Sequence, residues 1–254
     1  MRLTVLGCSG SFAGPTSPAS GYLVQAEQDG RSVSLVLDLG NGALGALQRH
    51  LDPDAVSAIF ITHLHPDHCL DLTGLYVYRK YHPNRPPVPA LPVYAPAGAQ
   101  ERLAAAYEGM DERGMDEQLH FHPVHDGSRV RLGPFVVTAY RVNHPVEAYG
   151  YRVEADGQVL AYTGDTDTCE RLQALCADAD LVLADSAFVE GRDLLRGIHL
   201  TGRRAALAAA GAGAKRLMLT HIPAWNDPEV CRAQAAEVWP GAVELAAPDA
   251  SYDV

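Results

Sequence analysis

Short apolar runs separated by turn-forming residues make up the first part of the chain. Branched and aromatic residues are concentrated in four runs, at 2–6, 22–26, 33–37 and 56–61. Runs of this length favour strands, and the turn Gln28-Asp29-Gly30 predicts a hairpin between the second run and the third. Residues 42–50 have leucines at helical spacing, and Asp52-Pro53 ends that helix.

The rest of the chain alternates between strand and helix patterns. Residues 81–96 contain six prolines and are predicted to form an extended surface segment. The remaining expected elements are helices at 98–108, 169–176, 201–210 and 228–238, and strands at 130–142, 149–162, 181–184 and 216–220. Strand-rich halves with helices outside predict α/β layers, and the absence of a linker or repeat predicts one domain over residues 1–254.

The composition is that of an ordinary globular protein with an acidic surface. The 254 residues are 47% hydrophobic and 20% charged, with a formal net charge of −11. This balance disfavours an extended binding surface for nucleic acid or for an anionic membrane, because both need clustered cationic side chains. Four basic residues in the middle of the chain are scattered and are predicted to be solvated: Arg79, Lys80, Arg85 and Arg113.

The cysteines and the N-terminus favour a cytoplasmic protein. The five cysteines are an odd number, and none forms a Cys-x-x-Cys pair. No apolar run precedes Gly7 that could act as a signal peptide, and no stretch of about 18 apolar residues could span a membrane. Reduced thiols in the cytoplasm are therefore expected.

Four metal-ligand residue types follow the apolar run at 56–61 within six positions. They are His63, His65, Asp67 and His68 in Thr62-His63-Leu64-His65-Pro66-Asp67-His68. Alternate side chains of an extended segment point the same way, so His63 and His65 can reach one ion together. Pro66 turns the chain toward a following helix, which allows Asp67 and His68 to face a neighbouring position.

Three further ligand types come directly after predicted strands. His144 follows the run at 130–142, Asp165 follows the run at 149–162, and His221 follows the run at 216–220. A single histidine after a strand is usually a surface residue. Four strand ends that each supply a ligand type indicate one shared metal site instead.

The motif His-x-His-x-Asp-His, followed by a later His, Gly-Asp-Thr and a final His, resembles the metallo-β-lactamase fold superfamily along the whole chain. The resemblance implies a four-layer αββα sandwich with two metal ions at one edge of its sheets. It implies one metal held by His63, His65 and His144, a second held by Asp67, His68 and His221, and Asp165 as a bridge between both.

A histidine-rich ligand set suits Zn²⁺ first, with Mn²⁺ and Fe²⁺ as alternatives. Two such ions about 4 Å apart can lower the pKa of a water molecule and clamp both oxygens of an in-line displacement at phosphorus. On this view Asp67 and Asp165 take part in catalysis through the metals.

A second motif, Gly197-Ile198-His199-Leu200-Thr201, resembles the ribonuclease Z branch of the superfamily. In that branch the histidine does not bind metal but faces the phosphate, so the resemblance implies that His199 stabilises the transition state or the leaving oxygen. Thr201 is expected to cap the next helix. Asp38 resembles the aspartate that holds a ligand histidine in its binding tautomer.

Ribonuclease Z carries a long basic arm between its third and fourth motifs, but Asp165 follows His144 by only 21 positions. The stretches 5–11, 45–50, 68–72 and 219–223 resemble an arm-less subgroup described as atypical cyclic-nucleotide phosphodiesterases. The expected function is therefore hydrolysis of a small phosphodiester, with 3′,5′-cyclic AMP as the expected substrate. Homodimers are common among such proteins, and the resemblance implies one here.

Three other functions stay open at this point. An RNA 3′-end endonuclease and a carboxylic ester or lactone hydrolase could use the same metals. A non-catalytic metal-binding protein is the third, although the di-iron branch usually has Glu at the position of His65. Several aromatic residues could stack on a base, although packing is the commoner role of such residues: Tyr76, Tyr78, Tyr81, Tyr149 and Trp225.

Overall fold

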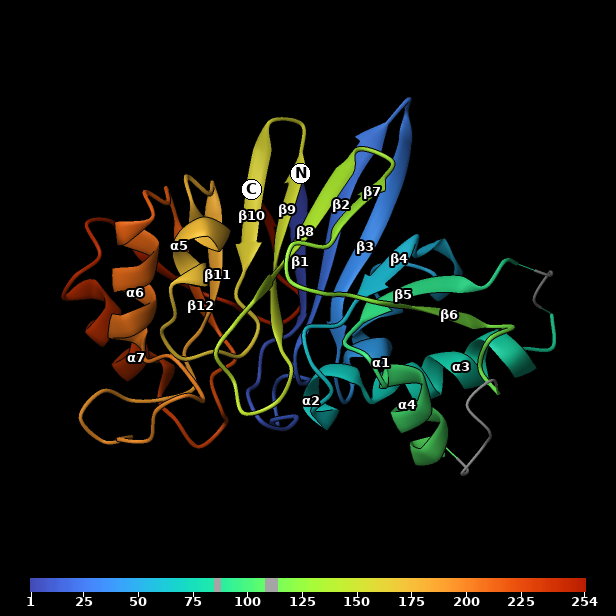
Figure 1. The fold of residues 1–254 in the computed structure, drawn as a ribbon, viewed down its shortest axis with the longest axis horizontal. Helices are drawn as coiled ribbons and strands as arrows, with labels where there is room; N and C mark the ends of the chain where they lie inside the picture. Colours follow the sequence, from blue (N-terminus) through green and yellow to red (C-terminus); the bar gives the residue numbers. More distant parts are fainter. Residues whose placement is uncertain (85–87, 108–113) are drawn as a thin grey trace.

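Two β-sheets packed face to face, with helices on their outer sides, form the protein (Figure 1). The computed structural model describes residues 1–84, 88–107 and 114–254. Within these residues the first sheet has the order β14-β1-β2-β3-β4-β5-β6 and the second has the order β13-β12-β11-β10-β9-β8-β7. This arrangement confirms the predicted four-layer αββα sandwich.

The first sheet consists of β1 (Arg2–Gly7), β2 (Gly21–Gln28), β3 (Arg31–Leu39), β4 (Ala58–Phe60), β5 (Leu91–Ala95), β6 (Leu119–Pro123) and β14 (Ser251–Asp253). The second consists of β7 (Arg129–Leu132), β8 (Phe135–Arg141), β9 (Tyr149–Ala155), β10 (Gln158–Tyr162), β11 (Leu181–Asp185), β12 (Leu217–Thr220) and β13 (Val243–Leu245). The first sheet is covered by α1 (Ala43–Leu47), α2 (Pro66–Cys69), α3 (Asp71–Tyr81) and α4 (Ala99–Tyr107), and the second by α5 (Arg171–Cys176), α6 (Gly202–Gly211) and α7 (Pro228–Ala236).

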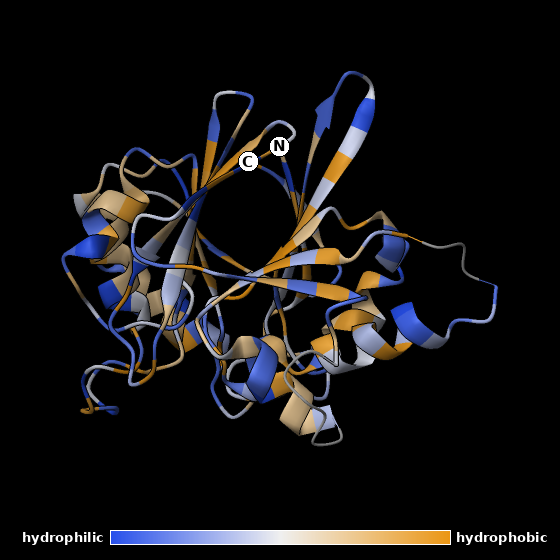
Figure 2. Cartoon of the chain, turned by 45° about the vertical axis from the view of Figure 1, so that its right-hand side comes forward, coloured by the Kyte–Doolittle hydropathy of each residue, from blue (hydrophilic) through white to orange (hydrophobic). Residues whose placement is uncertain are grey.

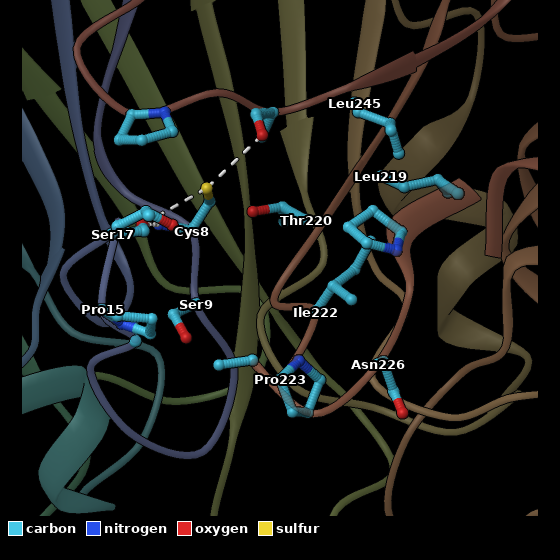
Figure 3. A pocket seen from close by; sticks show the side chains of 16 residues that line it. Cys8, Ser9, Pro15, Ser17, Leu219, Thr220, Ile222, Pro223, Asn226 and Leu245 are labelled. Atoms are coloured by element: carbon cyan, nitrogen blue, oxygen red, sulfur yellow. Dashed lines mark hydrogen bonds between the residues drawn. The ribbon is translucent and has the colours of Figure 1, made fainter. Parts of the chain in front are cut away.

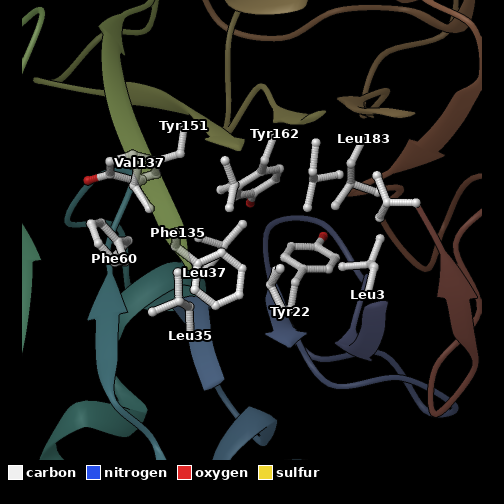
Figure 4. Packing of buried hydrophobic residues seen from close by; sticks show 14 of the residues in the cluster. Leu3, Tyr22, Leu35, Leu37, Phe60, Phe135, Val137, Tyr151, Tyr162 and Leu183 are labelled. Carbon is white, nitrogen blue, oxygen red and sulfur yellow. The ribbon is translucent and has the colours of Figure 1, made fainter. Parts of the chain in front are cut away.

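Apolar side chains from both sheets fill the space between them (Figure 4). The ring of Tyr22 in β2 lies 4.9 Å from that of Tyr162 in β10, and Phe60 in β4 lies 5.5 Å from Tyr151 in β9. Each buried ring of this size stabilises the fold by about 1.5–3 kcal/mol. The inner strand faces are accordingly hydrophobic, whereas the hairpin ends and outer helix faces are more polar (Figure 2).

The direction of the strands decides where the site forms. β8 is antiparallel to β9, and β9 is antiparallel to β10, so β8 and β10 run the same way. β11 and β12 continue in parallel from β10. The carboxyl ends of these four strands therefore meet at one edge of the second sheet, with the loops drawn at the bottom of Figure 1.

The proline-rich segment is not wholly an extended surface segment, which corrects the prediction for 81–96. Its last part is β5, which lies inside the first sheet between β4 and β6. Within β5, only Val93 and Tyr94 pair with β4, so Pro92 is paired with β6 alone. Proline, which has no amide hydrogen, is therefore placed where β5 is paired on one side only.

Two further corrections concern a basic residue and a set of short strands. Arg79 is buried rather than solvated, and its guanidinium binds Asp54 at 3.0 Å and the carbonyl of Gln118. Arg85 and Arg113 lie outside the described residues. Besides β5, three strands were not predicted, because each is short and depends on a neighbouring strand for its hydrogen bonds: β6, β13 and β14. No helix in the described ranges is long and apolar enough to cross a membrane.

Candidate metal centre

Histidines and aspartates that follow four different strands meet at one edge of the sandwich. His63 follows β4, His144 follows β8, Asp165 follows β10 and His221 follows β12. His63, Asp165 and His221 are each at most 2% exposed. The structure thus brings together side chains that lie up to 158 positions apart in the sequence.

The first group consists of three imidazoles and one carboxylate. The Nδ1 atom of His65 lies 2.9 Å from Nε2 of His63 and 3.2 Å from Nε2 of His144. Oδ2 of Asp165 lies 3.7 Å from Nε2 of His63. The four ligand atoms lie within 4.8 Å of one another, which is the spacing that one cation between them requires.

The second group shares Asp165 with the first. Nε2 of His68 lies 3.2 Å from Oδ1 of Asp165, and Nε2 of His221 lies 3.2 Å from its Oδ2. Oδ2 of Asp67 lies 3.4 Å from His68 and 3.9 Å from His221. Asp165 therefore stands between both groups, where a bridging carboxylate would have to be.

The unpaired atoms of the cluster fit a divalent metal. Nε2 of His68, Nε2 of His221 and Oδ1 of Asp165 are buried and have no hydrogen-bond partner among the described residues. A buried polar atom without a partner costs about 1–3 kcal/mol, and a cation at each group would satisfy these atoms. Imidazole with few carboxylates is a donor set for zinc and related first-row metals.

Two of the ligands are shifted toward their metal-binding forms, whereas Asp165 and Asp38 outweigh burial and raise the pKa of His68 well above its ordinary value. Burial and the neighbouring His68 lower the pKa of His63 well below its ordinary value. Burial alone would raise the pKa of Asp165, but His221 and His68 outweigh it and hold that pKa well below its usual range. Neutral imidazole and ionised carboxylate are the forms that bind metals.

Asp38 orients His68 from behind. Its carboxylate accepts hydrogen bonds from Nδ1 of His68 at 2.7 Å, from the Thr62 amide at 2.7 Å and from the Tyr162 hydroxyl at 2.8 Å. The side chain is fully buried, and its backbone adopts φ 58°. A left-handed aspartate costs about 1–3 kcal/mol, and such strain is typical of residues whose side chains must point in one direction.

Three other ligand imidazoles are also held through their second nitrogen. The partners of Nδ1 are Thr62 Oγ1 at 3.1 Å for His63, the Ile198 carbonyl at 2.9 Å for His144 and Ser20 Oγ at 3.0 Å for His221. Such contacts fix the tautomer and the ring orientation of a metal ligand.

His199 stands beside the cluster and is paired with a residue that the sequence did not reveal. Its Nδ1 lies 2.9 Å from Oδ2 of Asp185, which is fully buried at the end of β11. Burial alone would lower the pKa of His199, but Asp185 raises it to about 9. The ring lies 5.3 Å from that of His221, so a positive charge is held next to the second group.

Asp185 could have been found from its position. It ends the predicted strand at 181–184, as Asp165 and His221 follow theirs, and the parallel register of β11 places it at the same edge. Asp185, His199 and His221 form a third group of mutually close ligand atoms. The contact of Asp185 with Nδ1 of His199 fixes the orientation of this ring, as the Nδ1 contacts of the predicted ligands do.

A cavity of about 300 Å³ adjoins the residues on either side of His221 (Figure 3). It is lined by Thr220 and Ile222 on one wall and by Cys8 and Ser9 on the other. None of the residues that line it is charged, and burial raises the pKa of the Cys8 thiol above its ordinary value. An anionic group would therefore be bound at the His and Asp cluster rather than in this cavity.

Comparison with known proteins gives the same picture. The family described as "Beta-lactamase superfamily domain" matches residues 34–222. An uncharacterized protein of Mycobacterium leprae is 43% identical over 258 residues, covering all of this chain and 89% of that protein. Ribonuclease Z of Bacillus licheniformis is 28% identical over 277 residues, covering 88% and 89%.

The crystal structure of the metallo-β-lactamase fold protein YhfI from Bacillus subtilis superposes with a TM-score of 0.85 at 25% identity. The match covers 99% of this chain and 98% of that one. The family match spans most of the chain and includes all seven predicted ligands, and the fold agrees over its full length. The chain therefore belongs to the metallo-β-lactamase superfamily of metal-dependent hydrolases.

Proposed function

We propose that this protein hydrolyses phosphodiester bonds in small cyclic nucleotides, with 3′,5′-cyclic AMP as its first substrate and zinc as its metal. The observation that carries the proposal is the Asp185–His199 pair beside a cluster with room for two cations. A phosphodiester already carries a negative charge in the ground state, which a cationic side chain stabilises, whereas an ester or lactone acquires such a charge only in its transition state.

The side chains have separate roles in this proposal. When bound, two divalent ions would neutralise phosphate charge and make water a stronger nucleophile. His199, held in one orientation by Asp185, donates a proton or a hydrogen bond to the leaving sugar oxygen. Asp38 keeps the ring of His68 oriented. Together with the hydrogen bonds to the other ligand imidazoles, this contact limits movement of the ligands during the reaction.

Cleavage of RNA 3′ ends is the second candidate, because a relative that is 28% identical carries the name ribonuclease Z. Between His144 and Asp165 the chain forms only the hairpin of β9 and β10, which leaves no residues there for an arm. The net charge of −11 also gives poor steering toward a large polyanion. Both observations favour a small substrate.

One hydrolysis screen separates the candidates. Purified protein with measured metal content would be offered 3′,5′-cyclic AMP, other cyclic nucleotides, bis-(p-nitrophenyl) phosphate, a precursor tRNA and an aliphatic lactone. We expect turnover of cyclic nucleotides and little salt dependence. If the precursor tRNA is the preferred substrate and its cleavage rate falls steeply at higher salt, the ribonuclease is supported. If only the lactone is hydrolysed, the esterase is supported. Metal binding without any turnover would support a non-catalytic protein.

A further inference from the structure

Two large aromatic side chains are exposed next to each other on loops that the proposed function has not used. The rings of Phe12 and Trp225 lie 5.0 Å apart and are tilted by 40°. Phe12 is 41% exposed and Trp225 is 64% exposed. A paired aromatic surface that remains in water loses the stabilisation of burial, so its presence points to a ligand that covers it.

The pair stands close to the metal ligand His221. A Cβ atom at Gly10 would lie 2.3 Å from the carbonyl oxygen of His221 and 3.0 Å from its ring, so the Phe12 loop touches this ligand. The Phe12 amide donates to the Gly10 carbonyl at 2.7 Å. Trp225 follows His221 by four residues, which limits the distance between their Cα atoms to about 14 Å.

Backbone contacts hold the two loops side by side. Ser9 pairs with Ile222 in an isolated bridge, one residue after His221. Further along, a Cβ atom at Gly14 would lie 3.1 Å from that of Ala224. The two rings are thus presented from adjacent, tied segments and do not depend on a chance contact between loose loops.

The other aromatic candidates from the sequence are less suited to bind a base, among them Tyr78, whose hydroxyl donates to Asp52 at 3.1 Å. Tyr76 is fully buried and packs on Tyr107, and Tyr149 is 3% exposed with its hydroxyl bonded to Glu147. Tyr81 is exposed but ends α3, an eleven-residue helix of about 16 Å that leads away from the ligand motif.

We infer that Phe12 and Trp225 form a stacking platform for the base of a nucleotide whose phosphate lies at the His and Asp cluster. This inference rests on the proposed function and names the part of the substrate that gives specificity. Every base has a flat π face, so the platform selects nucleotides over base-free phosphodiesters rather than one base over another.

A kinetic comparison tests the inference. Trp225→Ala and Phe12→Ala should each raise KM for 3′,5′-cyclic AMP about tenfold or more, with little change in kcat. KM for the base-free ribose 3′,5′-cyclic phosphate should not change, and Trp225→Tyr should restore most of the affinity. Leu207→Ala, at a residue 53% exposed on α6, is the matched control and should behave like the original protein in both assays.

Fluorescence provides a readout that does not need turnover. The chain has two tryptophans, and Trp239 is 6% exposed, so in Trp239→Phe protein the emission comes from Trp225. Adenosine 5′-monophosphate should quench this emission, and ribose 5-phosphate at equal concentration should not. The original protein and the Trp225→Tyr variant provide the same comparison if Trp239→Phe fails to fold.

The outcomes separate this inference from the proposed function. Normal hydrolysis of cyclic AMP with unchanged KM in Trp225→Ala and no quenching would overturn the platform and leave the function standing. Failure of the original protein to hydrolyse any cyclic nucleotide would contradict the function. Base-dependent quenching in that case would still support the platform, and its absence would overturn both.

Discussion

Asp165 is the side chain on which the whole cluster depends, because its two carboxylate oxygens face different groups of ligands. Oδ1 lies near His68 and Oδ2 lies near His221 and His63. His199 differs in that its shortest polar contact, 2.9 Å, is with Asp185, while Oδ2 of Asp165 lies 3.9 Å away. The two residues should therefore give different results when they are removed.

For Asp165→Ala we expect loss of at least one metal per chain and a fall in kcat of about 1,000-fold or more.

For His199→Ala we expect two metals per chain and a fall in kcat of about 100-fold, because only transition-state stabilisation is lost. Elemental analysis and turnover of the same samples check both. Metal loss in His199→Ala would make His199 a ligand instead.

Asp38→Ala should weaken metal binding about 10- to 100-fold, because His68 loses the partner that fixes its ring. Competition with a chromogenic chelator measures this change. Tyr162→Phe is the control, since it removes one of the hydrogen bonds to Asp38 but leaves the contact with His68. Equal metal affinity in Asp38→Ala and the original protein would show that Asp38 is only structural.

At the scale of helices and strands, close packing against backbone separates glycines that are required from those that are not. A Cβ atom at Gly202, the first residue of α6, would lie 2.0 Å from the Cys231 carbonyl oxygen in α7. A Cβ atom at Gly45 in α1 would meet nothing within 4 Å. The packing of α6 against α7 therefore requires Gly202, whereas α1 does not require Gly45.

We expect Gly202→Ala to lower the free energy of unfolding by about 1–3 kcal/mol, because α6 and α7 must move apart. Gly45→Ala should raise it by about 0.5–1 kcal/mol by restricting the unfolded chain. Urea unfolding of both variants gives the two values. A stabilising effect of Gly202→Ala would show that α7 moves without cost.

Charge pairs also connect elements, and Asp126 joins the β7 loop to α5 through Arg171 at 2.6 Å. Partial burial raises the pKa of Asp126, but Arg171 outweighs it and leaves the pKa below its ordinary value. Because the pKa is lowered, the ion pair stabilises the protein fully at pH values above the ordinary aspartate pKa of about 3.9. This stabilisation is lost as the pH falls through the lowered pKa.

Asp126→Asn should therefore destabilise by up to about 1 kcal/mol at neutral pH, with a smaller difference in acid. Urea unfolding at several pH values measures this trend. Asp29→Asn, in the exposed turn between β2 and β3, serves as control and should show no such dependence. A difference that stayed constant down to strongly acidic pH would exclude the ion pair as its cause.

At the scale of the whole molecule, the metal cluster joins the two sheets, because His63 belongs to the first and the other strand-end ligands belong to the second. Two cations held between the sheets should stabilise the sandwich by mass action. Ligand at about 1,000 times its Kd contributes about 4 kcal/mol.

A chelator should accordingly lower Tm by several degrees, and Zn²⁺ or Mn²⁺ should restore it. Differential scanning calorimetry before and after chelation checks this. Asp165→Ala protein should respond much less to the chelator, because its cluster no longer bridges the groups. Equal responses of both proteins would place the stabilising ions elsewhere.

Much of this protein followed from local sequence pattern. Alternation and apolar runs predicted most strands, Thr201 was predicted as a cap and accepts the Arg204 amide at 3.2 Å, and the ligand types were visible at strand ends. These features depend on residues a few positions apart, so the sequence displays them directly. The resemblance to a known superfamily then assigned each ligand to a group.

Only the tertiary structure decided which distant side chains touch. The Asp185–His199 contact, the strands β13 and β14, the burial of Arg79 and the pairing of Phe12 with Trp225 depend on strand order and direction. No periodicity encodes such contacts, because each joins segments whose separation in the chain is unrelated to their separation in space. The sequence determined what kinds of groups are available, and packing of the two sheets decided which of them meet.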